Sequence, residues 1–205
     1  MKLCRIRALL TIALLTCVAT AQAAVHRVHP GESIQAAVDS AAPGDTILVE
    51  PGTYQEDPGN LYGLHITTEN LRLIGKVKKG QGEAGKVRLL HNGDQETGIY
   101  AAPAGCNYKD TSCASANLQD VYIRGFTVEG FPQNGIQTRW VDGFEFVRNE
   151  SVNNLNNGIY PTLSANGLVR NNVSYGSLDT SMWVAGSENV RVIGNELYGS
   201  PIGFE

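Results

Sequence analysis

The chain has 205 residues and a formal net charge of −4. Apart from the first residues, no stretch approaches the ~18 consecutive apolar residues of a membrane span, so we expect a chain without such a span. Removing residues 1–23 would take away three basic residues and no acidic one, changing the charge from −4 to −7. An acidic chain without a basic run argues against nucleic acid as a partner.

The N-terminus has the three parts of a secretory signal peptide. Basic residues precede an apolar run at 8–18, and small residues follow at Ala21 and Ala23. We therefore expect cleavage after Ala23 or Ala24 and a secreted or periplasmic protein. The predicted division of the chain is residues 1–23, the signal peptide, and residues 24–205, the mature domain.

Cysteines add two expectations. Cys17 lies near the end of the apolar run, but the threonine before it fits a lipoprotein signal poorly. Cys106 and Cys113 are close together in an exported chain, which favours a disulfide over a metal or redox site. A metal site would need further ligands nearby, and the histidines are scattered at positions 26, 29, 65 and 91.

The stretch that starts the mature domain, "GESIQAAVDSAAPGDTILVEPGTYQE", predicts a short helix and then a strand. Ile34, Ala37, Val38 and Ala41 form one apolar stripe, so residues 33–41 are expected to be helical. "PGD" ends the helix, and "TILVEPGTY" indicates a strand with a tight turn. Such a helix would cover the first edge of a sheet, which would otherwise pair with other chains.

Two interruptions are expected. Residues 98–118 carry both cysteines of the mature chain. They do not fit the 23-residue repeat of the second half of the chain and are predicted to bulge as a loop. At the other end, the chain stops at "PIGFE" in mid-repeat without a polar cap. We expect from this that the sequence is a truncated form of a longer protein and that it self-associates through its last repeat.

A 23-residue repeat runs through the second half of the chain. "NGLVRNNVSYG" is followed by "ENVRVIGNELYG", and Asn149, Asn172 and Asn195 are separated by 23 residues each. Further columns share this spacing: Val121, Phe144, Gly167, Val190; Ile123, Phe146, Val169, Val192; Gly130, Asn153, Gly176, Gly199; Ile136, Ile159, Met182. A period of this length indicates a solenoid.

The columns also predict what each repeat contains. Columns two residues apart are typical of strands, and no helical periodicity is present. Stacking the repeats ~4.8 Å apart would bury a continuous core and pair each strand with its neighbours. The predicted fold is therefore an all-β parallel β-helix with a short N-terminal capping helix.

Asparagine at a sharp corner has a structural explanation. Asn149, Asn172 and Asn195 are expected to tolerate left-handed backbone angles and to bond to one another along the stack. The first two also start Asn-X-Ser glycosylation motifs, which we regard as the weaker interpretation.

The N-terminal stretch and the asparagine-cornered repeats together resemble the exported right-handed β-helix proteins of the pectate-lyase-like superfamily. The resemblance implies a right-handed solenoid, and it covers the chain from about residue 45 to its end. It does not imply one reaction, because the superfamily contains polysaccharide lyases, polygalacturonases, mannuronan epimerases, phage tailspikes and proteins without an assigned activity.

Two outward surfaces could bind a sugar polymer. Gln137, Tyr160 and Trp183 share an outward column, and two stacked aromatic rings offer a platform for a pyranose. The alternative is that these rings pack beneath a loop. Asp179 and Arg139 lie close by in the repeat, with Thr180, Asn156 and Asn157.

The second surface is basic. Arg124 and Arg170 share a column, with Arg148 and Arg191 slightly displaced. Arginine pairs bidentately with a carboxylate, as a uronate lyase or epimerase requires. Interleaved glutamates make surface ion pairs the alternative. The predicted ligand-binding residues are Tyr160, Trp183, Asp179, Arg139, Arg170 and Arg148.

Catalytic residues are not predicted. A polygalacturonase-type hydrolase needs clustered carboxylates, but Asp142 and Asp179 are 37 residues apart. No metal, phosphate-loop or other cofactor motif is present, and Ca²⁺ is expected only if the protein is a lyase. We expect an exported β-helix that engages extracellular polysaccharide, as a lyase or epimerase on acidic glycans. The alternative is a non-catalytic binding or surface scaffold protein.

Overall fold

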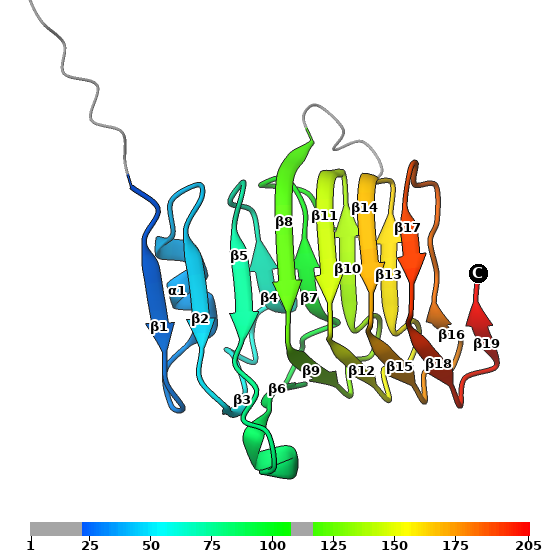
Figure 1. The fold of residues 1–205 in the computed structure, drawn as a ribbon, viewed down its shortest axis with the longest axis horizontal. Coiled ribbons are helices and arrows are strands. Elements are labelled where there is room, and N and C mark those ends of the chain that lie inside the picture. Colours follow the sequence, from blue (N-terminus) through cyan, green and yellow to red (C-terminus); the bar gives the residue numbers. More distant parts are fainter. Residues whose placement is uncertain (1–21, 108–116) are drawn as a thin grey trace, which may run out of the picture.

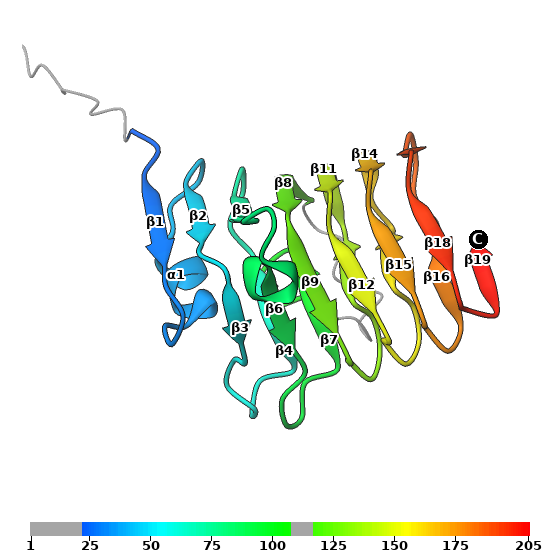
Figure 2. The ribbon, with the colours of Figure 1, turned by 60° about the horizontal axis from the view of Figure 1, so that its bottom comes forward.

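Three parallel sheets form the protein. The computed structural model describes residues 22–107 and 117–205, so the predicted signal peptide lies outside the described residues except for its last two positions. The strands follow one another around a solenoid and stack along its axis (Figures 1 and 2). No helix among the described residues is long and apolar enough to cross a membrane.

Each sheet takes one strand from nearly every turn of the solenoid. Sheet A contains β1 (Val25–Val28), β2 (Thr46–Val49), β5 (Arg72–Gly75), β8 (Leu118–Arg124), β11 (Val141–Val147), β14 (Ala165–Arg170) and β17 (Arg191–Ile193). Sheet B contains β3 (Gly52–Tyr54), β6 (Val87–Leu90), β9 (Phe126–Glu129), β12 (Glu150–Val152), β15 (Val173–Tyr175) and β18 (Glu196–Tyr198). Sheet C contains β4 (Tyr62–Ile66), β7 (Thr97–Ala101), β10 (Ile136–Arg139), β13 (Ile159–Thr162), β16 (Thr180–Met182) and β19 (Ile202–Phe204).

The register of the later strands confirms the repeat found in the sequence. Val121 pairs with Phe144, and Phe144 pairs with Gly167, each 23 residues further on. Ile136 pairs in the same way with Ile159, which pairs with Met182. A parallel β-helix is therefore the fold, while its right-handed sense stays a prediction from the resemblance.

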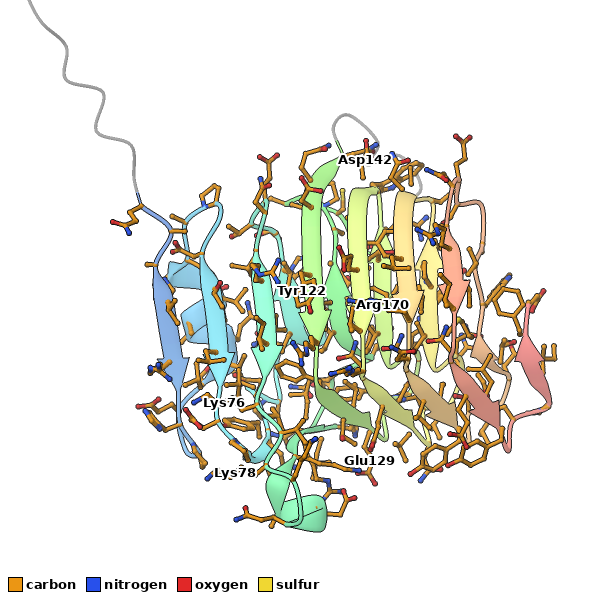
Figure 3. The ribbon with its side chains drawn as sticks, in the orientation of Figure 1. Lys76, Lys78, Tyr122, Glu129, Asp142 and Arg170 are labelled. Atoms are coloured by element: carbon orange, nitrogen blue, oxygen red, sulfur yellow. The ribbon has the colours of Figure 1, made fainter. Side chains whose placement is uncertain are left out.

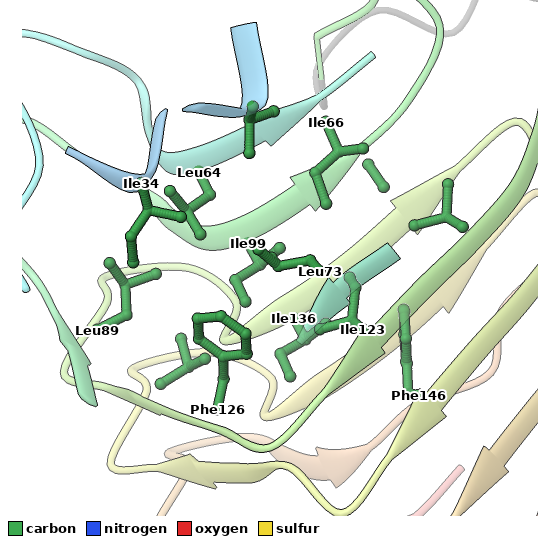
Figure 4. Packing of buried hydrophobic residues seen from close by; sticks show 14 of the residues in the cluster. Ile34, Leu64, Ile66, Leu73, Leu89, Ile99, Ile123, Phe126, Ile136 and Phe146 are labelled. Atoms are coloured by element: carbon green, nitrogen blue, oxygen red, sulfur yellow. The ribbon is translucent and has the colours of Figure 1, made fainter. Parts of the chain in front are cut away.

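Inward columns fill the interior with apolar side chains from all three sheets (Figure 4). Ile123, Phe146 and Val169 stack at the same height of sheet A, and none of them is exposed. Gly167 has a packing reason, because a Cβ there would lie 2.1 Å from the Phe144 ring. The glycine leaves space for that ring, which no larger residue would do.

A row of asparagine side chains runs along the solenoid axis at the corner between sheets A and B. The Asn149 side chain donates to Asn172 Oδ1 at 3.2 Å, and the Asn172 side chain donates to Asn195 Oδ1 at 2.9 Å. Each amide also donates to a backbone carbonyl of the strand below, as Asn172 does to Phe146 at 2.9 Å. The predicted bonding along the stack is confirmed.

The predicted left-handed backbone of these asparagines is wrong. Positive φ angles occur one residue earlier, at Gly125, Arg148, Asn171 and Gly194. Three more columns with a 23-residue step have positive φ: Asp120, Gly143, Asn166, Asn189; Gly130, Asn153, Gly176, Gly199; Trp140, Leu163, Gly186. The left-handed residue turns the chain, and the buried asparagine after it bonds to the backbone that the turn exposes.

The helix α1 (Ile34–Ser40) lies at the N-terminal end of the stack and packs on β1, β2 and β4 (Figure 1). Ser33 caps it by accepting the Ala36 N–H at 3.0 Å. Glu56 completes the cap, because its carboxylate accepts the Ile34 N–H at 2.7 Å and the Ser33 hydroxyl at 2.6 Å. The predicted helix over 33–41 is confirmed to within one residue at each end.

The predicted loop at 98–118 is shorter than expected. Residues 97–101 form β7, and Ile99 pairs with Ile136, 37 residues further on. Because an insertion lies between these strands, β7 does not share the 23-residue spacing. Cys106 is disulfide-bonded, and Cys113 lies outside the described residues. The 3-10 helix η1 (Gly82–Gly85) forms a second excursion, between β5 and β6.

At the C-terminal end, β17, β18 and β19 each form the edge of a sheet. Several large apolar side chains on these strands are exposed: Val192, Ile193, Tyr198, Ile202 and Phe204.

Candidate functional site

The predicted aromatic column lies on the outer face of sheet C. Tyr160 of β13 and Trp183, directly after β16, alternate with the buried Ile159 and Met182. Their rings stack with centroids 4.9 Å apart and planes 17° apart, and both side chains are half-buried. The stacking that the 23-residue register predicted is therefore present.

The same column continues toward the N-terminus in a more buried form. Gln137 pairs with Tyr100, and Tyr100 pairs with His65. Tyr100 is fully buried and packs with Tyr62 and Cys106 in a small apolar cluster outside the main core. Burial lowers the pKa of His65, which stacks on Tyr100 at 5.5 Å. This half of the column is packing, which leaves Tyr160 and Trp183 as its accessible part.

The six predicted ligand-binding residues do not form one site. Arg139 shares the outer face of sheet C but is only 8% exposed. Asp179 is exposed in the turn that leads into β16. Arg170 lies on β14 of sheet A, and Arg148 follows β11 at the corner between sheets A and B. The aromatic pair therefore lies on a different face of the solenoid from Arg148 and Arg170.

A basic groove surrounds Arg148 at this corner. It has a volume of about 610 Å³ and extends from the segment after β5 across β8 and β9 to β12. Its lining includes six basic residues: Lys76, Lys78, Lys79, Lys86, Arg124 and Arg148. Figure 3 shows Lys76 and Lys78 on the segment that leads out of β5. We refer to these six residues as the basic groove.

Two of the lysines are neutralised by neighbouring carboxylates. Lys76 pairs with Glu50, and Lys86 pairs with Glu150 at 2.7 Å and with Glu83 at 3.0 Å. Burial disfavours the charged form of Lys86, but its hydrogen bonds to Glu150 and Glu83 outweigh this and raise its pKa. Lys86 therefore stays charged, and each of the two lysines already has a carboxylate partner.

The other four cations are available. Among the described residues, Lys78, Lys79, Arg124 and Arg148 form no ion pair. Lys78, Lys79 and Arg148 are exposed, and Arg124 is half-buried. Unpaired cations around a concave surface attract anions more strongly than the same charges scattered over a convex one.

Arg170 extends this basic surface along the solenoid axis. Arg124 pairs with Val147, and Val147 pairs with Arg170, so the two arginines share an outward column two strands apart. Strand spacing places their backbones roughly 10 Å apart. The shared column predicted from the sequence is confirmed.

Sequence reasoning missed the lysines of the groove. The signal is "KVKKGQGEAGK" at 76–86, a lysine-rich segment that falls outside the 23-residue register. This segment is not a long basic run, because the cluster combines its lysines with arginines from two later turns of the solenoid. Net charge alone does not reveal such a local surface.

A second groove on the outer face of sheet A has mixed charge. Arg72, Tyr122, Glu145, Leu168 and Arg191 follow one another in register. The Arg72 guanidinium lies 4.0 Å from the centroid of the Tyr122 ring, so its charge is engaged with that ring. Because Glu145 lies between the arginines, this groove is less suited to a polyanion than the basic groove.

The described residues contain no cluster of three or more His, Cys, Asp or Glu side chains that could hold a metal ion. Glu150 is the carboxylate of the basic groove, and it accepts hydrogen bonds from Lys86 at 2.7 Å and Thr127 at 3.2 Å. The groove thus offers binding groups for an anion and one carboxylate that already has partners.

Comparison with known proteins gives a family without an assigned activity. No curated protein and no solved structure matches the chain. Residues 21–198 match the family described as "Protein of unknown function (DUF1565)". This match includes the capping helix, the basic groove and all but the last strand of the solenoid. The chain therefore belongs to the DUF1565 family.

Proposed function

We propose that this protein binds an acidic polysaccharide outside the cytoplasm, through the basic groove and Arg170. The observation that carries the proposal is the set of four groove cations that form no ion pair with any described residue, Lys78, Lys79, Arg124 and Arg148. Carboxylates of a uronate polymer would pair with them, bidentately in the case of the arginines.

The arrangement of the cations supports a linear ligand. Arg124 lies on β8, Arg148 follows β11, and Arg170 lies on β14, so basic groups recur along the axis of the stack. A polymer that lies parallel to this axis would meet one cation after another. Several weak contacts of this kind add up along one chain, because later contacts form at high effective concentration.

Binding is proposed here in preference to catalysis. A lyase or epimerase needs a base that removes the proton next to the uronate carboxylate. Glu150 is the carboxylate that lines the groove, and its hydrogen bonds to Lys86 and Thr127 compete with that role. The resemblance to polysaccharide-active right-handed β-helices supports the substrate class, and Ca²⁺ would matter only if a lyase activity were found.

The test compares the mature chain with a variant of the groove. Binding to polygalacturonate, alginate and neutral dextran is measured by calorimetry at low and moderate salt. We expect both acidic polymers to bind and dextran not to bind. Lys78→Gln combined with Lys79→Gln should weaken binding about tenfold, because each exposed pair contributes up to ~1 kcal/mol and a factor of ten equals ~1.4 kcal/mol.

The control is Arg72→Gln, an exposed arginine in the mixed groove on a strand distant from Arg170. It removes a charge of the same sign from the molecule, and affinity should stay within about twofold. No binding to either acidic polymer, or equal losses in the groove variant and the control, would refute the proposal. Ultraviolet absorbance recorded on the same mixtures would detect the unsaturated uronate made by a lyase, which would change the proposed function from binding to elimination.

A further inference from the structure

Asp45, which immediately precedes β2, holds the first described turn of the chain in place. It is 5% exposed and follows Gly44, a residue with positive φ. One carboxylate oxygen accepts the Ala24 N–H at 2.7 Å. The other accepts the Ala42 N–H at 3.0 Å and lies 2.8 Å from His26 Nε2. These bonds, the one to His26 foremost and then those to Ala24 and Ala42, lower the pKa of Asp45 to about 2.

The carboxylate is therefore ionised at neutral pH in a site that solvent hardly reaches. Among the described residues, its one ion-pair partner is His26, a side chain that carries charge only when protonated. A buried carboxylate is costly unless a positive group matches it. Its other partners in the described part of the chain are the neutral backbone amides of Ala24 and Ala42.

We propose that export cleaves the bond between Ala23 and Ala24, and that the new α-ammonium group of Ala24 pairs with Asp45. Hydrolysis breaks the amide bond, and water supplies a hydroxyl to the Ala23 carbonyl carbon and a proton to the Ala24 nitrogen. At neutral pH this amine takes up one more proton from solvent. Its nitrogen already lies within hydrogen-bond distance of the carboxylate, so no rearrangement is needed.

The structure distinguishes between the two cleavage sites that the sequence left open. Ala24 is held on both sides, since its N–H donates to Asp45 and its carbonyl accepts the Thr46 N–H at 2.9 Å. Gln22, Ala23 and Ala24 are all exposed, so the hydrogen bonds and not burial set Ala24 apart. Cleavage after Ala24 would remove both contacts, whereas cleavage after Ala23 keeps them and adds a charge.

The pairing would link processing to stability. β1 is the edge strand of sheet A, and Ala24 comes directly before it. In the precursor, Asp45 receives an amide hydrogen from Ala24; in the processed chain it receives an ammonium, which forms a stronger, charge-assisted bond. The processed chain would therefore anchor its first strand more firmly than the precursor.

The first experiment identifies the N-terminus of the exported protein. The full-length chain is expressed in a bacterial host with an intact export pathway, and the product is analysed by N-terminal sequencing and intact mass. We expect Ala24 as the first residue. A product that starts at Val25, or a chain that keeps its leader, overturns the proposal.

The second experiment isolates the charge. Two chains are released from a fusion, one starting at Ala24 and one at Ala23, each with Asp45 or with Asp45→Asn. We expect the substitution to lower the Tm by about 2–4 °C more in the chain that starts at Ala24, the shift that ~1 kcal/mol gives in a domain of this size. Asp94→Asn, at an exposed aspartate, is the control and should affect both chains equally.

A third measurement needs no variant and so does not depend on how Asp45→Asn folds. An ammonium held by Asp45 is a poor nucleophile, so an acylating reagent should modify the α-amino group of the Ala24 chain several-fold more slowly than that of the Ala23 chain. Equal modification rates, or equal losses of Tm in the two chains, would contradict the pairing.

Discussion

Neighbouring residues at one corner of the solenoid have different tasks. Asn171 is exposed and has a positive φ, so its contribution is a backbone conformation. Asn172 is 1% exposed and contributes side-chain hydrogen bonds. It accepts the Asn149 N–H at 2.9 Å and donates to the Phe146 carbonyl at 2.9 Å.

This division predicts opposite sensitivities. Asn172→Ala should lower the free energy of unfolding by about 2–4 kcal/mol, because the substitution leaves a buried N–H and a buried carbonyl without partners. Asn171→Gly should change it by less than about 0.5 kcal/mol, because glycine adopts positive φ without strain. Urea unfolding of the two variants measures both values. Equal losses would show that the corner depends on backbone conformation alone.

For this column of asparagines, the hydrogen bonds were predictable from the sequence, whereas the backbone angles were not. Spacing of 23 residues places Asn149, Asn172 and Asn195 at the same height of successive turns, and the bonds between them follow from that. Backbone angles do not follow from a column of asparagines. Arginine at 148 has a positive φ, although nothing in its chemistry favours one. Arg148 shares this angle with Gly125, Asn171 and Gly194, the residues at the same position of the neighbouring turns.

At the scale of one element, α1 depends on a residue far away in the sequence. The apolar periodicity of the helix and the serine before it can be recognised in the sequence. Glu56, however, lies 22 residues after Ile34, whose N–H it accepts. The strand–turn segment between them brings the carboxylate back to the helix. A cap supplied over such a distance carries no local sequence signal.

We expect Glu56→Ala to cost about 1–3 kcal/mol of unfolding free energy, because it leaves the buried Ile34 N–H without an acceptor. Glu69→Ala is the matched control, since Glu69 is exposed, and its effect should be within about 0.5 kcal/mol. Chemical denaturation provides the comparison, and the loss of helical circular dichroism would show whether α1 detaches first. A Glu56 variant as stable as the control would mean that water replaces the carboxylate as acceptor.

At the scale of the whole molecule, the strands within the 23-residue repeat were predictable, and the segments interrupted by insertions were not. Constant spacing revealed β8 to β18, whereas β7 was hidden by the insertion that follows it and the lysines of the basic groove lie in another such insertion. Insertions carry no period, and how they pack on the solenoid depends on contacts between distant residues. The aromatic pair was found because it belongs to the repeat.

The C-terminal edge gives a prediction about assembly. Ile193 is 45% exposed and Phe204 is 55% exposed on strands whose outer edges have no partner strand in the described stack. We expect the 205-residue chain to self-associate as its concentration rises, because exposed apolar edges recruit further strands. Sedimentation velocity measures this directly.

Ile193→Lys combined with Phe204→Lys should shift the equilibrium to monomer, since charged residues on an edge strand oppose pairing. A wild-type chain that stays monomeric at every concentration would show that the exposed edge is tolerated as it is.

The left-handed columns also determine which changes in length the solenoid can accept. Four of them recur at a 23-residue step, and each bend must stay above the bend of the turn below. Deleting residues 150–172 would join Asn149 to Val173, the partner of Glu150. Every later bend would then take the position of the equivalent bend in the preceding turn. A deletion a few residues longer or shorter would shift all four bends at once. The solenoid can therefore become longer or shorter only by whole 23-residue turns.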